Sequence, residues 1–160
     1  MAVGGTKRST VEGSKPAPWY TPAISEHGVF WVELHNGKEE IWWLRSGTPQ
    51  AEQLASGNEP LRHVVAHGDH VAWMGDTAIH LKNLSEAETV EFSGAVHTND
   101  ALALSEGLLC YEASSEGNID IFCSNGLHLD RPQNQRKPRL WKRWLLFHEG
   151  QQVLLYGPIK

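Results

Sequence analysis

The chain contains four copies of one pattern, and this repetition constrains its fold more than any other feature of the sequence. Each copy reads as a short apolar strand, a tight polar turn, a longer apolar strand, a second turn and a third strand. The copies are TPAISEHGVFWVELHNGKEEIWWL, RHVVAHGDHVAWMGDTAIHLKNL, DALALSEGLLCYEASSEGNIDIFC and PRLWKRWLLFHEGQQVLLYG. Self-similarity of this kind predicts that one supersecondary unit is repeated four times.

The spacing of the copies indicates the size of the unit. We take the third apolar position of each second strand as the marker. The marker residues are Trp31, Trp73, Cys110 and Phe147, which are 42, 37 and 37 residues apart. This period is typical of a four-stranded antiparallel blade. Weaker fourth strands follow the first three copies, at residues 51–55, 88–92 and 127–130. We therefore expect an all-β domain over residues 16–160, with blades at about 16–56, 57–93, 94–131 and 132–160.

The last copy ends at Lys160 without a fourth strand. Residues 7–13, KRSTVEG, resemble the other fourth strands because they are short and polar and precede a glycine-containing connector. We expect residues 1–15 to be a flexible lead whose strand completes the last blade, since an N-terminal strand of this kind closes a ring and hides its edges.

The turns support strands rather than helices. Asn36-Gly37 is a strong hairpin signal because a type I′ turn needs positive φ at both central residues. Glycine and proline are frequent, with 15 and 8 residues, and apolar residues form short runs instead of a helical period. We expect no helix.

Two of the copies resemble blades of the TolB-like and WD-type β-propeller repeat family. They are PAISEHGVFWVELHNGKEEIWWL, residues 22–44, and ALALSEGLLCYEASSEGNIDIFC, residues 101–123. The resemblance covers residues 16–158 and implies a β-propeller architecture, with no catalytic residue carried over. Such propellers usually contain about six to eight blades. Four blades therefore leave three possibilities: a small closed ring, an eight-blade ring shared by a homodimer, or a piece of a longer protein.

Composition limits the partners. The net charge is −5, so we expect no nucleic acid partner. No apolar run is long enough to span a bilayer, so we expect no membrane partner. The N-terminus lacks the apolar stretch of a secretory signal, which predicts a cytoplasmic protein unless a leader has been removed. Cys110 and Cys123 are the two cysteines, and we expect small buried hydrophobic side chains, with a cross-strand disulfide as the alternative.

The predicted binding face is formed by the connectors between blades and by the second turn of each blade. Arg62, Asp100 and Arg139 enter innermost strands, and His97 lies in the connector SGAVHTN. Trp19 lies in the connector KPAPWY, where an exposed indole suits a sugar or a peptide. We expect these five residues to bind a protein segment or a carbohydrate, in a non-catalytic binding module.

Three histidines are weak candidates for metal binding. His63, His67 and His70 lie close to Asp69 in sequence, and imidazole with carboxylate suits zinc, manganese or iron. A strand places His63 at the far end from the other two, so we expect neither a metal nor another cofactor. Two alternatives stay open: an enzyme, such as a lyase or hydrolase, with polar residues at a channel mouth and a histidine-bound metal, or the structural half of a larger ring.

Overall fold

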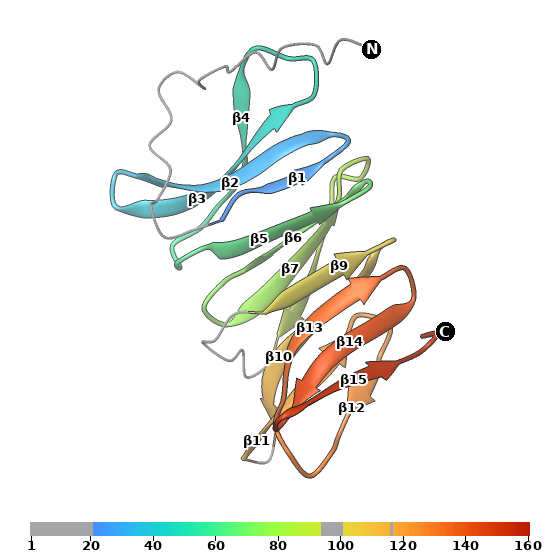
Figure 1. Cartoon of the computed structure of the whole chain (residues 1–160). Helices are drawn as coiled ribbons and strands as arrows, with labels where there is room; N and C mark the ends of the chain where they lie inside the picture. Colours follow the sequence, from blue (N-terminus) through green and yellow to red (C-terminus); the bar gives the residue numbers. More distant parts are fainter. Residues whose placement is uncertain (1–20, 94–100, 116) are drawn as a thin grey trace, which may run out of the picture.

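The computed structural model describes residues 21–93, 101–115 and 117–160, which form strands and turns alone. The strands make four antiparallel sheets, arranged one after another along the molecule (Figure 1). The described part of the chain has no helix that is long and apolar enough to cross a membrane. The all-β, blade-like architecture expected from the repeats is therefore confirmed.

The sheets follow the order of the chain, and each is called a blade here. Blade 1 contains β1 (Ala23–Ser25), β2 (Gly28–His35), β3 (Lys38–Arg45) and β4 (Ala51–Ser56). Blade 2 contains β5 (Arg62–His67), β6 (His70–Met74), β7 (Ala78–Asn83) and β8 (Thr89–Ser93). Blade 3 contains β9 (Leu102–Ser105), β10 (Leu108–Ser115), β11 (Asn118–Cys123) and β12 (His128–Leu129). Blade 4 has three described strands, β13 (Gln135–Trp141), β14 (Trp144–Glu149) and β15 (Gln152–Tyr156).

The turn between β2 and β3 has the predicted geometry. Asn36 and Gly37 have φ values of 51° and 78°, and His35 pairs with Lys38 across the turn. Positive φ at both central residues matches the right-handed twist of the flanking strands. This hairpin fixes the register of the longest strand pair in blade 1.

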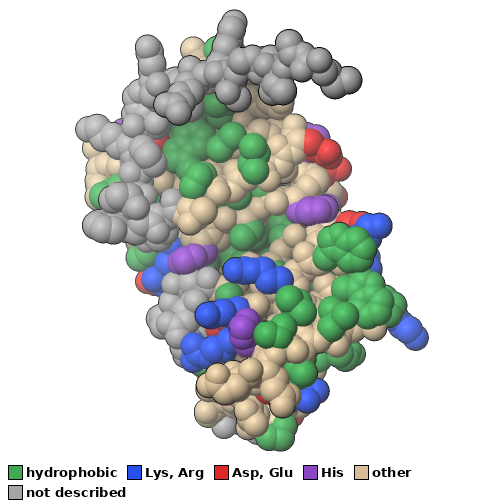
Figure 2. All heavy atoms as spheres, viewed as in Figure 1, with side chains coloured by type: hydrophobic (Ala, Val, Ile, Leu, Met, Phe, Trp, Pro, Cys, Tyr) green, Lys and Arg blue, Asp and Glu red, His purple; other side chains and the backbone are tan. Residues whose placement is uncertain are grey.

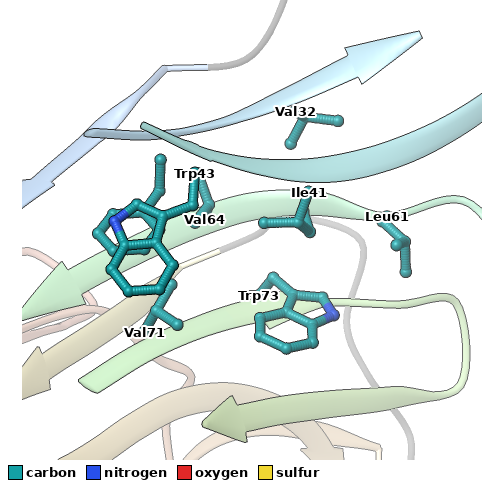
Figure 3. Packing of buried hydrophobic residues seen from close by; sticks show 8 residues of the cluster. Val32, Ile41, Trp43, Leu61, Val64, Val71 and Trp73 are labelled. Atoms are coloured by element: carbon teal, nitrogen blue, oxygen red, sulfur yellow. The ribbon is translucent and has the colours of Figure 1, made fainter. Parts of the chain in front are cut away.

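Neighbouring blades pack face to face through alternate side chains of their strands. Phe30 and Val32 on β2 share one cluster with Val71 and Trp73 on β6, and Figure 3 shows part of this cluster between the two sheets. The opposite face of β6 packs against blade 3, and blade 3 packs against blade 4 in the same way. Every junction between consecutive blades is therefore a small apolar core.

The register of the first hairpins corrects one position of the sequence alignment. The first hairpin of each blade joins its first and second strands through a two-residue turn. The fourth residue after this turn is Trp31, Trp73, Tyr111 and Phe147 in blades 1 to 4, so Tyr111 and not Cys110 is equivalent to the other three. Blade 3 starts its second strand with apolar Leu108, where blades 1 and 2 start with Gly28 and His70. Counting apolar residues alone therefore shifted this copy by one residue.

The two cysteines form a disulfide. Cys110 on β10 pairs directly with Cys123 on β11, and their sulfur atoms are 1.99 Å apart. The expectation of two unpaired buried side chains was wrong, and the alternative is correct. The reason is that directly opposite positions bring the two Cα atoms to 4.0 Å, within reach of a single S–S bond.

The described blades form an open array. The innermost strands contact one another in the order β1, β5, β9 and β13. Blades 1 and 4 lie at opposite ends of the molecule (Figure 1). The predicted closing strand at residues 7–13 lies outside the described residues.

Candidate functional site

The innermost strands of all four blades line one shared groove. Its volume is about 740 Å³. The lining residues come from β1, β5, β9, β13 and the segments just before β1 and β9: Thr21, Pro22, Ala23, Ile24, His63, Val64, Val65, Ala66, Ala101, Leu102, Ala103, Leu104, Lys137, Arg139 and Leu140. We call this surface the axial groove. Every blade contributes residues to it.

Two inner strands carry a bulge at equivalent positions. The pairing shifts between Arg62 and Val65 on β5 and between Arg136 and Arg139 on β13. Within these bulges His63 and Lys137 have φ values of 52° and 55°. An extra residue in one strand changes the direction of its side chain, and both residues line the axial groove. The bulges therefore place a histidine and a lysine at matching sites in blades 2 and 4.

A buried carboxylate on blade 3 holds the bulge of blade 4. Glu112 on β10 is 2% exposed, and its Oε1 accepts a hydrogen bond from the backbone N–H of Lys137 at 2.5 Å. A charge-assisted hydrogen bond of this kind is stronger than a neutral one. The position of the Lys137 backbone is thus fixed by the neighbouring blade.

The axial groove is basic although the whole chain is acidic. Lys137 and Arg139 are exposed there, and His63 is half-buried. Figure 2 shows Lys, Arg and His side chains gathered in the middle of the view, beside β9 and β13. Clustered cations in a concave surface attract anions and donate charge-assisted hydrogen bonds to them.

The groove also offers backbone hydrogen-bonding groups. Each of β1, β5, β9 and β13 is the edge strand of its sheet. The outer edge of such a strand presents N–H and C=O groups that no strand of its own sheet uses. An extended segment can pair with an edge of this type.

The predicted ligand-binding residues fall into three groups. Arg139 lines the axial groove, whereas Arg62 forms an ion pair with Asp76 in the turn after β6, with 3.0 Å between Nη2 and Oδ1. Trp19, His97 and Asp100 lie outside the described residues. The structure therefore places one of the five in the groove, together with Lys137, which the sequence indicates only as one member of the basic, anion-attracting run at residues 131–143.

The three candidate metal-binding histidines have separate surroundings. His63 lines the axial groove. His67 lies at the other end of β5, where its Nδ1 accepts a hydrogen bond from the backbone N–H of Glu106 at 3.2 Å. His70 is the neighbour of Gly107 in the first turn of blade 3.

Another group of metal-ligating atoms occurs at the junction of blades 1 and 2. Among the described residues, Glu26, His27 and Asp69 bring ligand atoms within 4.8 Å of one another. His27 Nε2 is 2.5 Å from Asp69 Oδ1, and the Asp69 side chain is 63% exposed. Aligning the first turns of blades 1 and 2 would have brought these residues together, but sequence reasoning did not consider contacts between turns. The contact between His27 and Asp69 joins the two blades at an exposed position.

A smaller polar pocket lies at the predicted binding face, beside the connector from blade 3 to blade 4. Its volume is about 390 Å³, and Asn118, Asp120 and His128 are among its lining residues. Asp120 is 2% exposed and its Oδ2 is 2.8 Å from His128 Nε2, while Asn118 donates to its Oδ1 at 3.1 Å. The connector residue Arg131 donates from Nε to Glu149 at 2.8 Å, and this hydrogen bond raises the pKa of Arg131. The connectors predicted this face, and Arg131 belongs to the basic run at residues 131–143, but Asn118, Asp120 and His128 were not predicted.

Comparison with known proteins gives the fold. No protein-family model and no curated protein sequence matches the chain. Among solved structures, a puromycin-hydrolysing peptidase of Mycobacterium tuberculosis aligns with 12% identity and a TM-score of 0.61, over 85% of this chain and 27% of the peptidase. TolB from Acinetobacter baumannii aligns with 17% identity and a TM-score of 0.57, over 89% of this chain and 40% of TolB. A nidogen/laminin complex aligns with 12% identity and a TM-score of 0.55, over 90% of this chain and 64% of the matched chain.

The chain thus spans only part of each of these proteins, from about a quarter to just under two thirds of their length. The alignments cover most of the four blades. Because the identities are low, they show a similar fold and nothing about function. Together with the four successive antiparallel sheets, they show that the chain has a TolB-like β-propeller architecture.

Proposed function

We propose that this chain is a non-catalytic binding module that holds an extended, acidic segment of another protein in the axial groove. The observation that carries the proposal is the placement of Lys137 and Arg139, two exposed cations on one inner strand, in a groove lined by all four blades. The chain as a whole has a net charge of −5, whereas the groove lining contains these two cations and no carboxylate.

The ligand chemistry follows from the two kinds of hydrogen-bonding group that the groove offers, cationic side chains and backbone groups. Guanidinium and ammonium groups bind carboxylates through charge-assisted hydrogen bonds. The edges of the inner strands offer backbone groups at the regular spacing of an extended peptide. An extended acidic peptide uses both kinds of contact at once, which a compact anion cannot do.

The comparisons agree with this proposal but are not the evidence for it. One similar fold occurs in a solved complex of nidogen with laminin. The likeness to the peptidase supports the architecture and no hydrolytic step, because its identity to this chain is 12%. The carbohydrate alternative rests on Trp19, which lies outside the described residues.

Binding of short labelled peptides tests the proposal. Fluorescence anisotropy of a fluorescein-labelled octaglutamate should report binding, and an octalysine peptide should not bind. The double variant Lys137→Ala, Arg139→Ala should weaken binding about tenfold, which corresponds to about 1.4 kcal/mol. The matched control is Lys142→Ala, Arg143→Ala, which removes the same charge from the first turn of the same blade, outside the groove lining.

The control distinguishes binding in the axial groove from a general electrostatic attraction of the peptide. Equal weakening in both double variants would show that the peptide responds to the positive charge of blade 4 in general rather than to the groove, and no binding to the wild-type protein would overturn the proposal. Binding of neutral glycans in the absence of peptide binding would favour the carbohydrate alternative.

The disulfide bears on the compartment. Disulfides persist in oxidising compartments and are rare in the cytoplasm. The Cys110–Cys123 bond therefore supports a location outside the cytoplasm. Thiol titration of denatured protein, purified without reductant, should find no free thiol; two thiols per chain would support the cytoplasm.

A further inference from the structure

Blade 4 ends the array with an apolar face that nothing in the described structure covers. Cross-strand pairing places Trp144, Leu146 and Leu155 on this face, and they are 37%, 42% and 64% exposed. Trp141 and Val153 lie on the same face and are also exposed. A hollow of about 550 Å³ lies on this face and is lined by Arg139, Leu140, Trp141, Trp144, Leu146 and Leu155. We call this surface the terminal face, and Figure 2 shows hydrophobic side chains gathered near the turn between β13 and β14.

The corresponding face of every other blade is buried under the next blade. Leu146 is the third residue after the turn that joins the first and second strands of blade 4. The same position is occupied by Phe30 in blade 1, Ala72 in blade 2 and Cys110 in blade 3. Each of these three is 0% exposed. Blade 4 therefore carries the side chains of an internal blade on a face that no described blade covers. An exposed apolar patch of this kind is typical of an interaction site.

Blade 1 has the matching surface at the opposite end of the array. Its face away from blade 2, called the front face, carries Ile24, Val29 and Leu44, which cross-strand pairing places side by side. Ile24 is 75% exposed, and the other two are half-buried. Trp42 and its cross-strand partner Trp31 lie on the same face; Trp42 is half-buried and Trp31 is 8% exposed.

The charges of the two faces are complementary. Glu33 and Glu40 form a cross-strand pair on the front face, near the end of β2; Glu33 is 6% exposed and Glu40 is half-buried, so Glu40 is the more accessible carboxylate. Their carboxylates accept hydrogen bonds from the indole N–H groups of Trp31 and Trp42, at 3.1 and 3.0 Å.

On the terminal face, Arg136 and His148 form the cross-strand pair near the end of β14, the equivalent end of the blade. Packing the terminal face on a front face in the geometry of the other junctions brings the basic pair to the acidic pair. Opposite charges at the same end fix the register of such an interface.

We propose that the terminal face of one chain packs against the front face of a second copy. Two copies joined in this way form two identical junctions related by a two-fold axis, which is a closed arrangement. The product is a ring of eight blades, in which the axial grooves of the two chains become one channel. This proposal does not depend on the ligand of the groove, because the mass of the protein in solution reports it directly.

Sedimentation equilibrium over a wide range of concentrations tests the proposal. The wild-type protein should have twice the chain mass of 17.9 kDa. Leu146→Arg on the terminal face should raise the dissociation constant of the dimer about 100-fold. Leu44→Arg on the front face should have a similar effect, since each junction uses one face of each kind. Val90→Arg is the matched control because Val90 is 55% exposed on β8, away from both faces, and it should stay dimeric.

A charge exchange guards against variants that fail to fold. Arg136→Glu should weaken the dimer about tenfold, and adding Glu40→Lys should restore most of the loss. A monomeric wild-type protein would overturn the proposal. So would a dimer that is sensitive to Leu146→Arg but not to Leu44→Arg, because the terminal faces would then pair with each other.

Discussion

The two faces of blade 4 have similar side chains and opposite surroundings. Leu145 and Phe147 point toward blade 3 and are 0% and 2% exposed, whereas Leu146 between them is 42% exposed on the terminal face. Successive residues of a strand point to opposite faces, so one apolar run supplies both surfaces. The comparison shows that the neighbouring blade, rather than the residue type, decides whether a position belongs to a core. Four variants test this difference, from the largest expected effect to the smallest.

Removing the Phe147 side chain should have the largest effect. Phe147 packs with Leu108, Ile121 and Leu145 in the junction between blades 3 and 4, so Phe147→Ala leaves a cavity in a filled core. The free energy of unfolding should fall by roughly 3–5 kcal/mol, as measured by urea denaturation followed by tryptophan fluorescence. A loss below about 1 kcal/mol would show that this junction is not a packed core.

Breaking the disulfide should have the next largest effect. Cys110→Ala with Cys123→Ala removes a covalent link between residues 13 positions apart, on the face of blade 3 that packs against Phe147. The free energy of unfolding should fall by about 3 kcal/mol. Urea denaturation of the wild-type protein with and without dithiothreitol gives an independent measure. Identical curves for the wild-type protein under the two conditions would contradict the bond.

The ion pair at the rim of a junction should contribute much less than the apolar core. His27 and Asp69 join blades 1 and 2, but their side chains are 40% and 63% exposed. Water and salt screen such a pair, so Asp69→Asn should change the free energy of unfolding by less than about 1 kcal/mol. Thermal denaturation at low and high salt checks this, because the difference should shrink as salt is added. A larger, salt-independent loss would assign a structural role to the group.

Substitution on the terminal face should have the smallest effect on the fold of one chain. In the Leu44→Arg background, where the chain is expected to be monomeric, Leu155→Ala should change the free energy of unfolding by no more than about 0.5 kcal/mol. In the wild-type background the same substitution should weaken the dimer. Thermal denaturation and sedimentation of both proteins provide the comparison, and a large loss in the monomeric background would show that Leu155 is already packed within one chain.

The architecture could be predicted because it depends on local patterns. The four copies, their apolar alternation and the Asn36-Gly37 turn each act within about 40 residues, and the structure shows the corresponding hairpins and blades. The opposition of Cys110 and Cys123 also follows from a local turn. Whether those thiols are oxidised does not, because oxidation depends on the compartment as well as on distance.

The candidate site could be predicted only in part because it depends on contacts between blades. Arg139 was expected at an inner strand and lines the axial groove. Lys137 was recognised only as part of a basic run, because its place in the groove depends on a bulge with positive φ at a lysine, held by a glutamate 25 residues earlier in the chain. The residues of this bulge include no glycine, so nothing in the local sequence indicates it. The pair Asp120 and His128 was missed for a similar reason, since β12 pairs with β11 through only two residue pairs.

The measurement that tests the open array most directly is cross-linking between its two ends. Leu44 and Leu155 lie on the third strands of blades 1 and 4, on the front and terminal faces respectively. The variant Leu44→Cys, Leu155→Cys, treated with a short bis-maleimide, should give a covalent dimer on a denaturing gel, and neither single variant should. A cross-link within one chain would contradict the account, because it would mean that four blades close into a ring on their own.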